Sequence, residues 1–201
     1  MKKCVKVAVT GGIGSGKTSV LAILKNLGYK IYNCDESAKK ALKNRKIIKS
    51  IKKQFPFAVS GVIFPRVNKK LLADKVFADE KARKQLEMIT HPFIVNDVIK
   101  KAEKEGGISF IEVPLLFEGG YQNLFDKTIV ILRDKTERIK SVMERSNLTE
   151  KEVLARMNSQ IEYDKKDFSN YIVIVNNGDK EQLEKDVLAV STKINNDKKR
   201  R

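Results

Sequence analysis

"TGGIGSGKTS", residues 10–19, places four glycines in ten positions between an apolar run and a segment with helical periodicity. Within it, Gly11-x-x-x-x-Gly16-Lys17-Thr18 matches GxxxxGK[ST], the phosphate-binding loop, in its required context of buried strand, loop and helix. Glycines allow positive φ and close approach of the backbone, so successive N–H groups can surround a phosphate at a helix N-terminus. The stretch therefore predicts a nucleotide site inside an α/β fold.

Alternation of apolar runs with helical patterns extends this prediction to the rest of the chain. Short runs rich in Val, Ile and Phe are typical of buried strands, and helical segments separate them. We therefore expect an α/β, P-loop NTPase-type three-layer fold, in which helices cover both faces of a five-stranded, mostly parallel sheet. The predicted strands are 5–10, 29–33, 108–113, 127–132 and 171–175.

About 75 residues separate the second and third predicted strands, far more than one crossover helix needs. The excess predicts an inserted helical lobe with helices near 67–77 and 80–104, the longer one kinked or interrupted at Pro92. Gly28 is expected to end the first helix. After the fourth strand, two helices broken near residues 146–147 are expected to form a lid.

Composition limits the class of protein. With 201 residues and 41% hydrophobic composition, the chain can bury one substantial core. A formal charge of +16 favours polyanionic partners, namely nucleotides, nucleic acid or an acidic membrane, without choosing among them. No signal peptide is evident and the apolar runs are too short to span a membrane. We expect a cytoplasmic protein, with the terminal charge run 195–201 a frayed, solvated end.

Other nucleotide-binding classes fit less well. A GxGxxG dinucleotide loop is disfavoured by Lys17 and Thr18. No NKxD tetrapeptide is present to select guanine, and the chain is too short for most motor or helicase cores. A small kinase remains, with Lys17 bridging the β- and γ-phosphates and the Thr18 hydroxyl on Mg²⁺. The expected ATP cradle consists of Gly12, Ile13, Gly14, Ser15, Gly16, Lys17, Thr18 and Ser19.

A kinase also needs a carboxylate near its acceptor and cations over the transferred group. Asp35 directly follows the second predicted strand and is the candidate for the acceptor side; it can equally cap the helix that it opens. Arg138, Arg145 and Arg156 lie in the predicted lid and are candidates for charge neutralisation, although each alone is typical of a solvated surface.

These motifs, taken together, are similar to one family. The segments TGGIGSGKTS, YNCDESAKKAL, ITHPFI, EVPLLFE, RDKTERIKSVMERSNLTEKEVLARMNSQ and YIVIVNNG follow one another as in dephospho-CoA kinases, and the chain resembles that family from residue 5 to about 188. The resemblance implies ATP-dependent phosphorylation of the ribose 3′-hydroxyl of dephospho-CoA, the last step of coenzyme A synthesis, with ATP and Mg²⁺ required.

The resemblance also implies an architecture and residue roles. It implies one kinase domain over 1–201, with a core of about 1–36 and 106–201, an inserted substrate lobe of about 37–105 and a lid of about 138–168. The implied catalytic residues are Asp35, Lys17 and Arg145. Implied contacts are Arg138 and Arg156 to the nucleotide, Asp35, Lys39, His91 and Glu118 to the acceptor, and Thr18 to Mg²⁺, with Asp35 or Glu112 reaching the ion through water.

Some alternatives stay open. His91 can contact the acceptor or cap a broken helix, and Lys39 stands where arginine is frequent in the family that the chain resembles. Another P-loop metabolite or nucleoside monophosphate kinase is the alternative enzyme. A basic nucleic-acid-binding module is the alternative of a different class, motivated only by the charge. We expect dephospho-CoA as the partner, no nucleic acid or membrane, and a monomer, with an oligomer left open.

Overall fold

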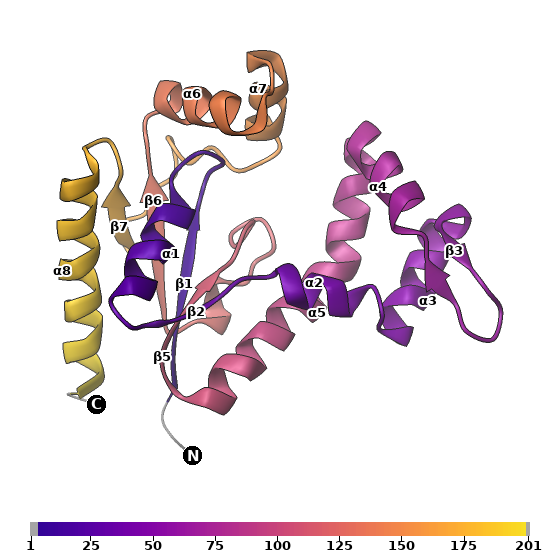
Figure 1. The fold of residues 1–201 in the computed structure, drawn as a ribbon, viewed down its shortest axis with the longest axis horizontal. Coiled ribbons are helices and arrows are strands. Elements are labelled where there is room, and N and C mark those ends of the chain that lie inside the picture. Colours follow the sequence, from indigo (N-terminus) through magenta and orange to yellow (C-terminus); the bar gives the residue numbers. More distant parts are fainter. Residues whose placement is uncertain (1–3, 200–201) are drawn as a thin grey trace. The chain divides into compact units, whose positions relative to one another are not determined.

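The computed structural model, which describes residues 4–199, contains a five-stranded sheet (Figure 1). Its strand order is β2-β5-β1-β6-β7 and every pairing is parallel. The strands are β1 (Cys4–Gly11), β2 (Lys30–Tyr32), β5 (Gly107–Glu112), β6 (Lys127–Leu132) and β7 (Ile172–Val175). The α/β fold and its five predicted strands are confirmed, each within a residue or two of its predicted ends.

The central strand β1 explains how the sheet positions the loop. It lies between β5 and β6, and Val7, Ala8 and Val9 are completely buried. In register, Val9 lies opposite Glu112 and Gly11 lies opposite Ile131. Because parallel strands end at the same edge of a sheet, the residues that follow β1, β5, β6 and β7 gather at one edge.

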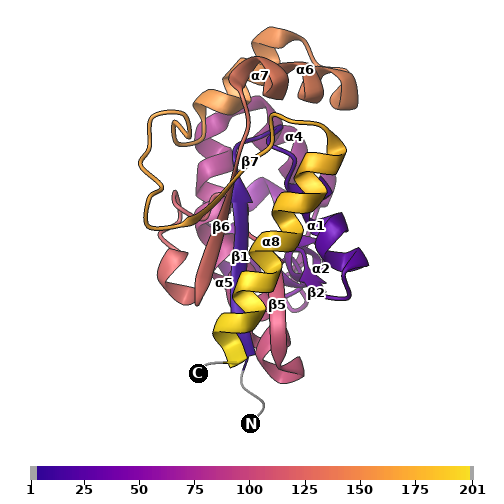
Figure 2. The same cartoon turned by 90° about the vertical axis from the view of Figure 1, so that its left-hand side faces the viewer.

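Helices and an aromatic cluster cover the two faces of this sheet. On one face α1 (Lys17–Asn26) and α8 (Lys180–Lys199) pack on the strands and on each other (Figure 2). On the opposite face, Tyr163 and Phe168 pack on Val130 of β6. The helices α6 (Lys135–Ser146) and α7 (Glu150–Asn158) follow β6, and a short 3₁₀ turn, η2 (Gln122–Leu124), precedes it.

Local signals in the sequence fix several helix ends. Gly28 has φ of 85°, its N–H donates to the Lys25 carbonyl, and the Tyr29 N–H donates to the Leu24 carbonyl, which is a complete Schellman motif at the end of α1. At the start of α7, Thr149 and Glu152 form the two reciprocal bonds of a capping box. The predicted break between the two helices that follow β6 is confirmed at Asn147, which adopts the left-handed conformation.

The chain divides into two compact units, described separately below. Unit 1 contains the sheet and comprises the described parts of 1–32 and 102–201. Unit 2 comprises residues 33–101 and packs around Ile51, Phe55 and Leu72. Its elements are α2 (Asp35–Ala41), α3 (Arg45–Gln54), η1 (Pro56–Ala58), β3 (Val59–Ser60), β4 (Arg66–Val67), α4 (Lys69–Ala78) and most of α5 (Glu80–Glu105).

Two expectations differ from the structure. The helix α5 continues through Pro92 over 26 residues, so the expected interruption is wrong, while the alternative expectation of a kink at Pro92 stays a prediction. Proline removes one helical hydrogen bond, but α5 buries Ala82 before Pro92 and Ile94 and Val98 after it, which favours continuation. The expected frayed end is also wrong up to Lys199, where α8 ends; residues 200–201 lie outside the described residues.

The end of α8 is held by an ion pair, in which the Lys127 ammonium lies 2.7 Å from the Asp197 carboxylate. Ile194, one turn earlier, is buried in the core. These contacts explain why a charged segment stays helical. Among residues 4–199, no helix is both long enough and apolar enough to cross a bilayer.

Candidate active site

The loop between β1 and α1 has a backbone that only glycine accommodates at its turning points. Gly14 and Gly16 have φ of 78° and 94°, and Gly16 is the N-cap of α1. A Cβ atom on Gly16 would collide with the side-chain amide of Asn176, which donates a 2.9 Å hydrogen bond to the Ser15 carbonyl. Asn176 directly follows β7, so the far edge of the sheet holds the loop in shape.

Lys17 occupies the first position of α1 and turns back over the loop. Its ammonium donates to the carbonyls of Gly11 at 2.7 Å and Gly12 at 3.0 Å. Burial, together with the nearby Arg138 and Arg145 cations, lowers the pKa of Lys17 to about 8, while Glu112 opposes this shift. The Lys17 ammonium is therefore a buried cation whose positive charge the nearby carboxylate offsets only in part.

Two amides of the loop already have partners within the protein. The Ile13 N–H donates to the Gln160 side chain at 2.8 Å, and the Ser15 N–H donates to the Gly12 carbonyl at 3.2 Å. The Ser15 hydroxyl is buried and has no hydrogen-bond partner among the described residues. A free polar atom and a glycine-lined concavity are features that suit a phosphate.

A cleft of about 800 Å³ opens beside this loop, a size suited to a nucleotide. It brings together residues from four parts of unit 1, all near the edge where the strands end. Its lining includes Ile13, Gly14, Gly16, Lys17, Thr18 and Ser19 of the loop and the start of α1, Glu112 at the end of β5, Arg133 and Arg145 after β6, and Asn176 and Lys180 after β7.

The three lid arginines of the sequence prediction have different surroundings. Arg145 lines the cleft. Arg138 is 4% exposed, donates to the Ile13 carbonyl at 3.1 Å and pairs with Asp164 at 3.4 Å, so it supports the loop from behind. Burial lowers the pKa of Arg138. Arg156 is exposed on α7 and is not among the residues that line the cleft.

Arg133 is a cleft residue that the sequence argument did not identify. It follows β6 directly, its guanidinium lies 3.5 Å from the Gly14 carbonyl, and it pairs with Glu137 at 3.4 Å. Asn176 was missed in the same way. Both come immediately after a predicted strand, and the rule that parallel strands end at one edge was the available signal for them.

The donor set suits a magnesium ion. Thr18, with an exposed side chain, and Glu112 line the same cleft. Within residues 4–199 no cluster of three or more His, Cys, Asp and Glu side chains forms an all-protein metal cage. Mg²⁺ typically uses one or two protein oxygens and completes its shell with phosphate oxygens and water, so a hydroxyl and a carboxylate that line one cleft fit it.

Glu118 contacts the segment that follows α7. Its carboxylate accepts a hydrogen bond from the Ile161 N–H at 3.0 Å, next to Gln160, whose side chain binds the Ile13 amide. Glu118 is exposed and lies outside the residues that line the cleft. These two bonds tie the segment after α7 to the loop and to the turn that follows β5.

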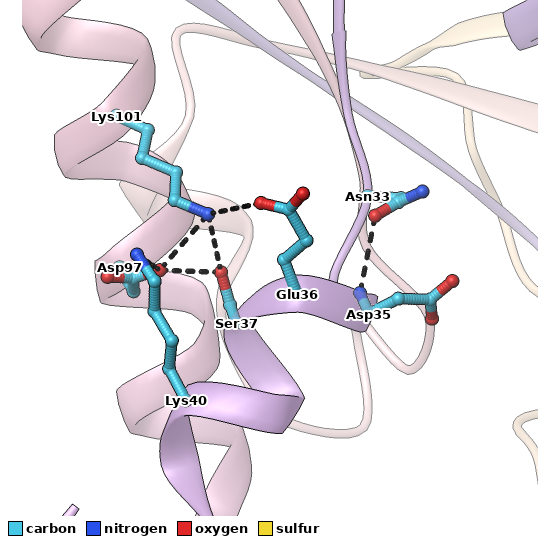
Figure 3. Close-up of polar contacts among 7 residues, drawn as sticks. All are labelled: Asn33, Asp35, Glu36, Ser37, Lys40, Asp97 and Lys101. Carbon is cyan, nitrogen blue, oxygen red and sulfur yellow. Dashed lines mark hydrogen bonds and ion pairs between the residues drawn. The ribbon is translucent and has the colours of Figure 1, made fainter. Parts of the chain in front are cut away.

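The remaining candidates belong to unit 2. Asp35 is the first residue of α2, its side chain is exposed, and its N–H donates to the Asn33 side chain at 3.3 Å. Figure 3 shows its carboxylate pointing away from Lys101. Lys39 is exposed on the same helix. His91 is half-buried on α5, and burial lowers its pKa, which favours a neutral imidazole.

Comparison with known proteins points in one direction. The model of the dephospho-CoA kinase family matches residues 5–182. A dephospho-CoA kinase of Thermus thermophilus is 34% identical over 189 residues, covering 94% of this chain and 91% of the relative. A solved Thermus thermophilus structure is 34% identical with a TM-score of 0.76, and a solved dephospho-CoA kinase from Campylobacter jejuni is 29% identical with a TM-score of 0.66; each alignment covers 96% of this chain and 98% of the other.

Proposed function

Because the chain belongs to the dephospho-CoA kinase family, we propose that it transfers the γ-phosphoryl group of ATP to the ribose 3′-hydroxyl of dephospho-CoA, which gives coenzyme A. The observation that carries the proposal is the cleft in which Lys17, Thr18 and two arginines surround a glycine loop at the end of β1. Such a site binds a nucleoside triphosphate, and the family supplies the acceptor.

ATP binding is proposed to replace the hydrogen bonds of the Lys17 ammonium to the loop by bonds to phosphate oxygens. In the structure, the Lys17 ammonium donates to the carbonyls of Gly11 and Gly12. With ATP bound, the ammonium moves to oxygens of the β- and γ-phosphates, and free amides of the loop bind the β-phosphate at the N-terminus of α1. Arg138 keeps its bond to Ile13 and maintains the shape of the loop.

Asp35 is proposed to orient the acceptor. Its carboxylate accepts a hydrogen bond from the 3′-hydroxyl and takes its proton as the oxygen attacks the γ-phosphorus in line. The bond from the γ-phosphorus to the bridging oxygen breaks in the same step and ADP leaves, without a covalent intermediate. Lys39, His91 and Glu118 are proposed acceptor contacts. We propose that His91 acts as an uncharged imidazole that forms hydrogen bonds, because burial lowers its pKa.

Positive charge around the cleft stabilises the transferred group. Arg133 and Arg145 line the cleft. Arg156 lies on α7 within the proposed lid, and closure of this lid would bring a further cation to the transferred phosphoryl group. Thr18 is proposed to hold Mg²⁺, with Asp35 or Glu112 reaching it through water. The ion supplies neutralisation of phosphate charge when bound. Positioning and charge neutralisation together are the main sources of acceleration.

The division of the chain suits this chemistry. We propose that the core is about 1–36 and 106–201, that 37–105 is the acceptor lobe, and that about 138–168 closes over the reactants as a lid. The stretch between Glu36 and Asp74 contains no acidic residue and many lysines, which favours an anionic ligand such as the diphosphate of dephospho-CoA.

An acceptor panel tests the proposal. The purified protein is incubated with Mg²⁺ and ATP, and ADP release is measured with dephospho-CoA, AMP, CMP, gluconate or shikimate as the acceptor. We expect release with dephospho-CoA at least about 100-fold above that with each of the others, because only the matched acceptor uses the full binding energy of the site. Equal or greater release with another acceptor would assign the site to a different kinase reaction.

A further inference from the structure

The helix that begins with Asp35 is too short to hold its own position. α2 has seven residues, and isolated helices of this length are not stable in water. Its N-cap, Cys34, makes no side-chain capping bond, and the Asp35 N–H has a contact of 3.3 Å with Asn33. The direction of the Asp35 carboxylate therefore depends on contacts made by the rest of α2.

The anchor of α2 is a polar network with α5. Ser37, two residues after Asp35, is completely buried and donates a 2.7 Å hydrogen bond to the Asp97 carboxylate (Figure 3). The Lys101 ammonium lies 3.4 Å from Asp97 and 3.4 Å from the Ser37 hydroxyl. Each polar group at the centre of this network has a partner of the opposite kind, which makes the contact directional.

Charge strengthens this anchor. The Asp97 side chain is 23% exposed and also lies 3.5 Å from the Lys40 ammonium of α2. Although burial acts to raise the pKa of Asp97, the Ser37 hydrogen bond and Lys101 outweigh it and keep the pKa below its ordinary value. A hydrogen bond from a buried hydroxyl to a charged carboxylate is stronger than one between neutral groups. Glu36 adds an exposed pair to Lys101 at 3.4 Å.

We propose that Asp97, acting through Ser37, is a positioning residue for Asp35: it fixes the first turn of α2 so that the Asp35 carboxylate faces the acceptor hydroxyl. The inference rests on the proposed function, since it gives Asp35 a reaction to orient. Phosphoryl transfer depends on alignment, and displacement of a reacting group by about 1 Å can cost 100-fold in rate. Asp97 itself need not touch either substrate.

A double-mutant cycle tests this coupling. We expect Asp97→Ala to lower kcat about 10- to 100-fold while changing the KM for ATP less than about twofold. In the Asp35→Asn background the same substitution should cost less than about threefold, because the carboxylate that it positions is gone. Residual turnover is followed with radiolabelled ATP. An equal cost in both backgrounds, or parental turnover in Asp97→Ala, overturns the proposal.

Further variants separate positioning from general damage. Asp97→Asn keeps an acceptor for Ser37 and should lose less turnover than Asp97→Ala, and Ser37→Ala should resemble Asp97→Ala. Asp74→Ala removes an exposed carboxylate of the same unit, on α4, and should leave turnover unchanged. Equal losses in Asp97→Asn and Asp97→Ala, or a loss in Asp74→Ala, would overturn the assignment of a specific anchor.

Hydrogen exchange completes the test, because it does not depend on catalysis. Hydrogen exchange of the first turn of α2 should accelerate in Asp97→Ala, while exchange in the phosphate-binding loop stays as in the parent. Unchanged exchange in α2 overturns the inference. Failure of the proposed function looks different: parental turnover in Asp35→Asn removes Asp35 from the mechanism, whatever Asp97 does. If Asp35→Asn loses turnover while the Asp97 variants keep the turnover of the parent, the proposed function stands and only the positioning role of Asp97 is overturned.

Discussion

At the scale of single residues, Lys17 combines the features that the reaction needs. Its ammonium is held by two loop carbonyls, and burial lowers its pKa to about 8. A bound triphosphate favours the charged form and therefore raises this pKa. The complex then holds more protons than the separate partners at a pH near the free value, which links nucleotide affinity to pH.

This linkage gives a prediction with a defined sign. At about pH 8, where Lys17 is half protonated in the free protein, ATP binding should take up about half a proton per site. Affinity should be insensitive to this group well below pH 8 and should fall as the pH rises above it. Calorimetric titration without acceptor, in buffers of different ionisation enthalpy, measures the uptake.

Substitution of the lysine supplies the control for this measurement. Arginine stays protonated throughout this range, so Lys17→Arg should abolish the proton uptake that belongs to residue 17 and leave only that of ATP and Mg²⁺. Uptake equal to that of the parent in Lys17→Arg would show that another group titrates and that the ammonium is not in contact with the phosphates.

At the scale of elements, the junction of β1, loop and α1 depends on glycine for two separable reasons. Gly16 and Gly28 both have positive φ, at 94° and 85°. A Cβ atom on Gly16 would collide with Asn176, whereas a Cβ atom on Gly28 has nothing within 4 Å. Substitution of Gly28 by alanine therefore reports the backbone cost alone, whereas substitution of Gly16 adds the disruption of the loop.

We expect Gly28→Ala to lower the free energy of unfolding by about 1 kcal/mol with ATP affinity unchanged. Gly16→Ala should destabilise the protein by at least as much and should also lower ATP affinity by about 10-fold or more, because the loop must move away from Asn176. Denaturant unfolding and nucleotide titration measure the two quantities. Parental ATP affinity in Gly16→Ala would contradict the role of the loop shape.

Elements with strong local signals were predictable from the sequence. The core strands are short runs of β-branched residues, and Gly28 and the Thr149 capping box mark helix ends by their chemistry. The hairpin of β3 and β4 was not predicted, because its strands have two residues each and its tip exposes Val62, Ile63 and Phe64. An exposed apolar run contradicts the burial pattern on which such predictions rest.

The candidate site was predictable only in part, for a related reason. The phosphate-binding loop is local, so its residues appear as one motif in the sequence. Arg133 and Asn176 join it from the ends of other strands and Lys180 joins it from the start of α8, and only the folded sheet brings them to one cleft. Ser37 and Asp97 are 60 residues apart, and neither belongs to a motif that indicates their contact.

At the scale of the whole molecule, ATP is proposed to bind unit 1, and the acceptor is proposed to contact Asp35, Lys39 and His91 of unit 2 as well as Glu118 of unit 1. Hydrogen exchange can test this division, because a bound ligand protects the segments that it orders. ATP alone should protect the phosphate-binding loop and α1, and dephospho-CoA alone should protect the first turn of α2. Protection by dephospho-CoA confined to unit 1 would contradict the division. The cytoplasmic location stays a prediction from the sequence.

The central claim is that the protein builds a new phosphate ester on the ribose of dephospho-CoA, and identification of the product tests it most directly. The protein is incubated with Mg²⁺, ATP and dephospho-CoA, and the isolated product is studied by mass spectrometry and phosphorus NMR. We predict a gain of one phosphate, as a monoester at the ribose 3′ position with the diphosphate intact. No new ester, or an ester at another position, would contradict the account.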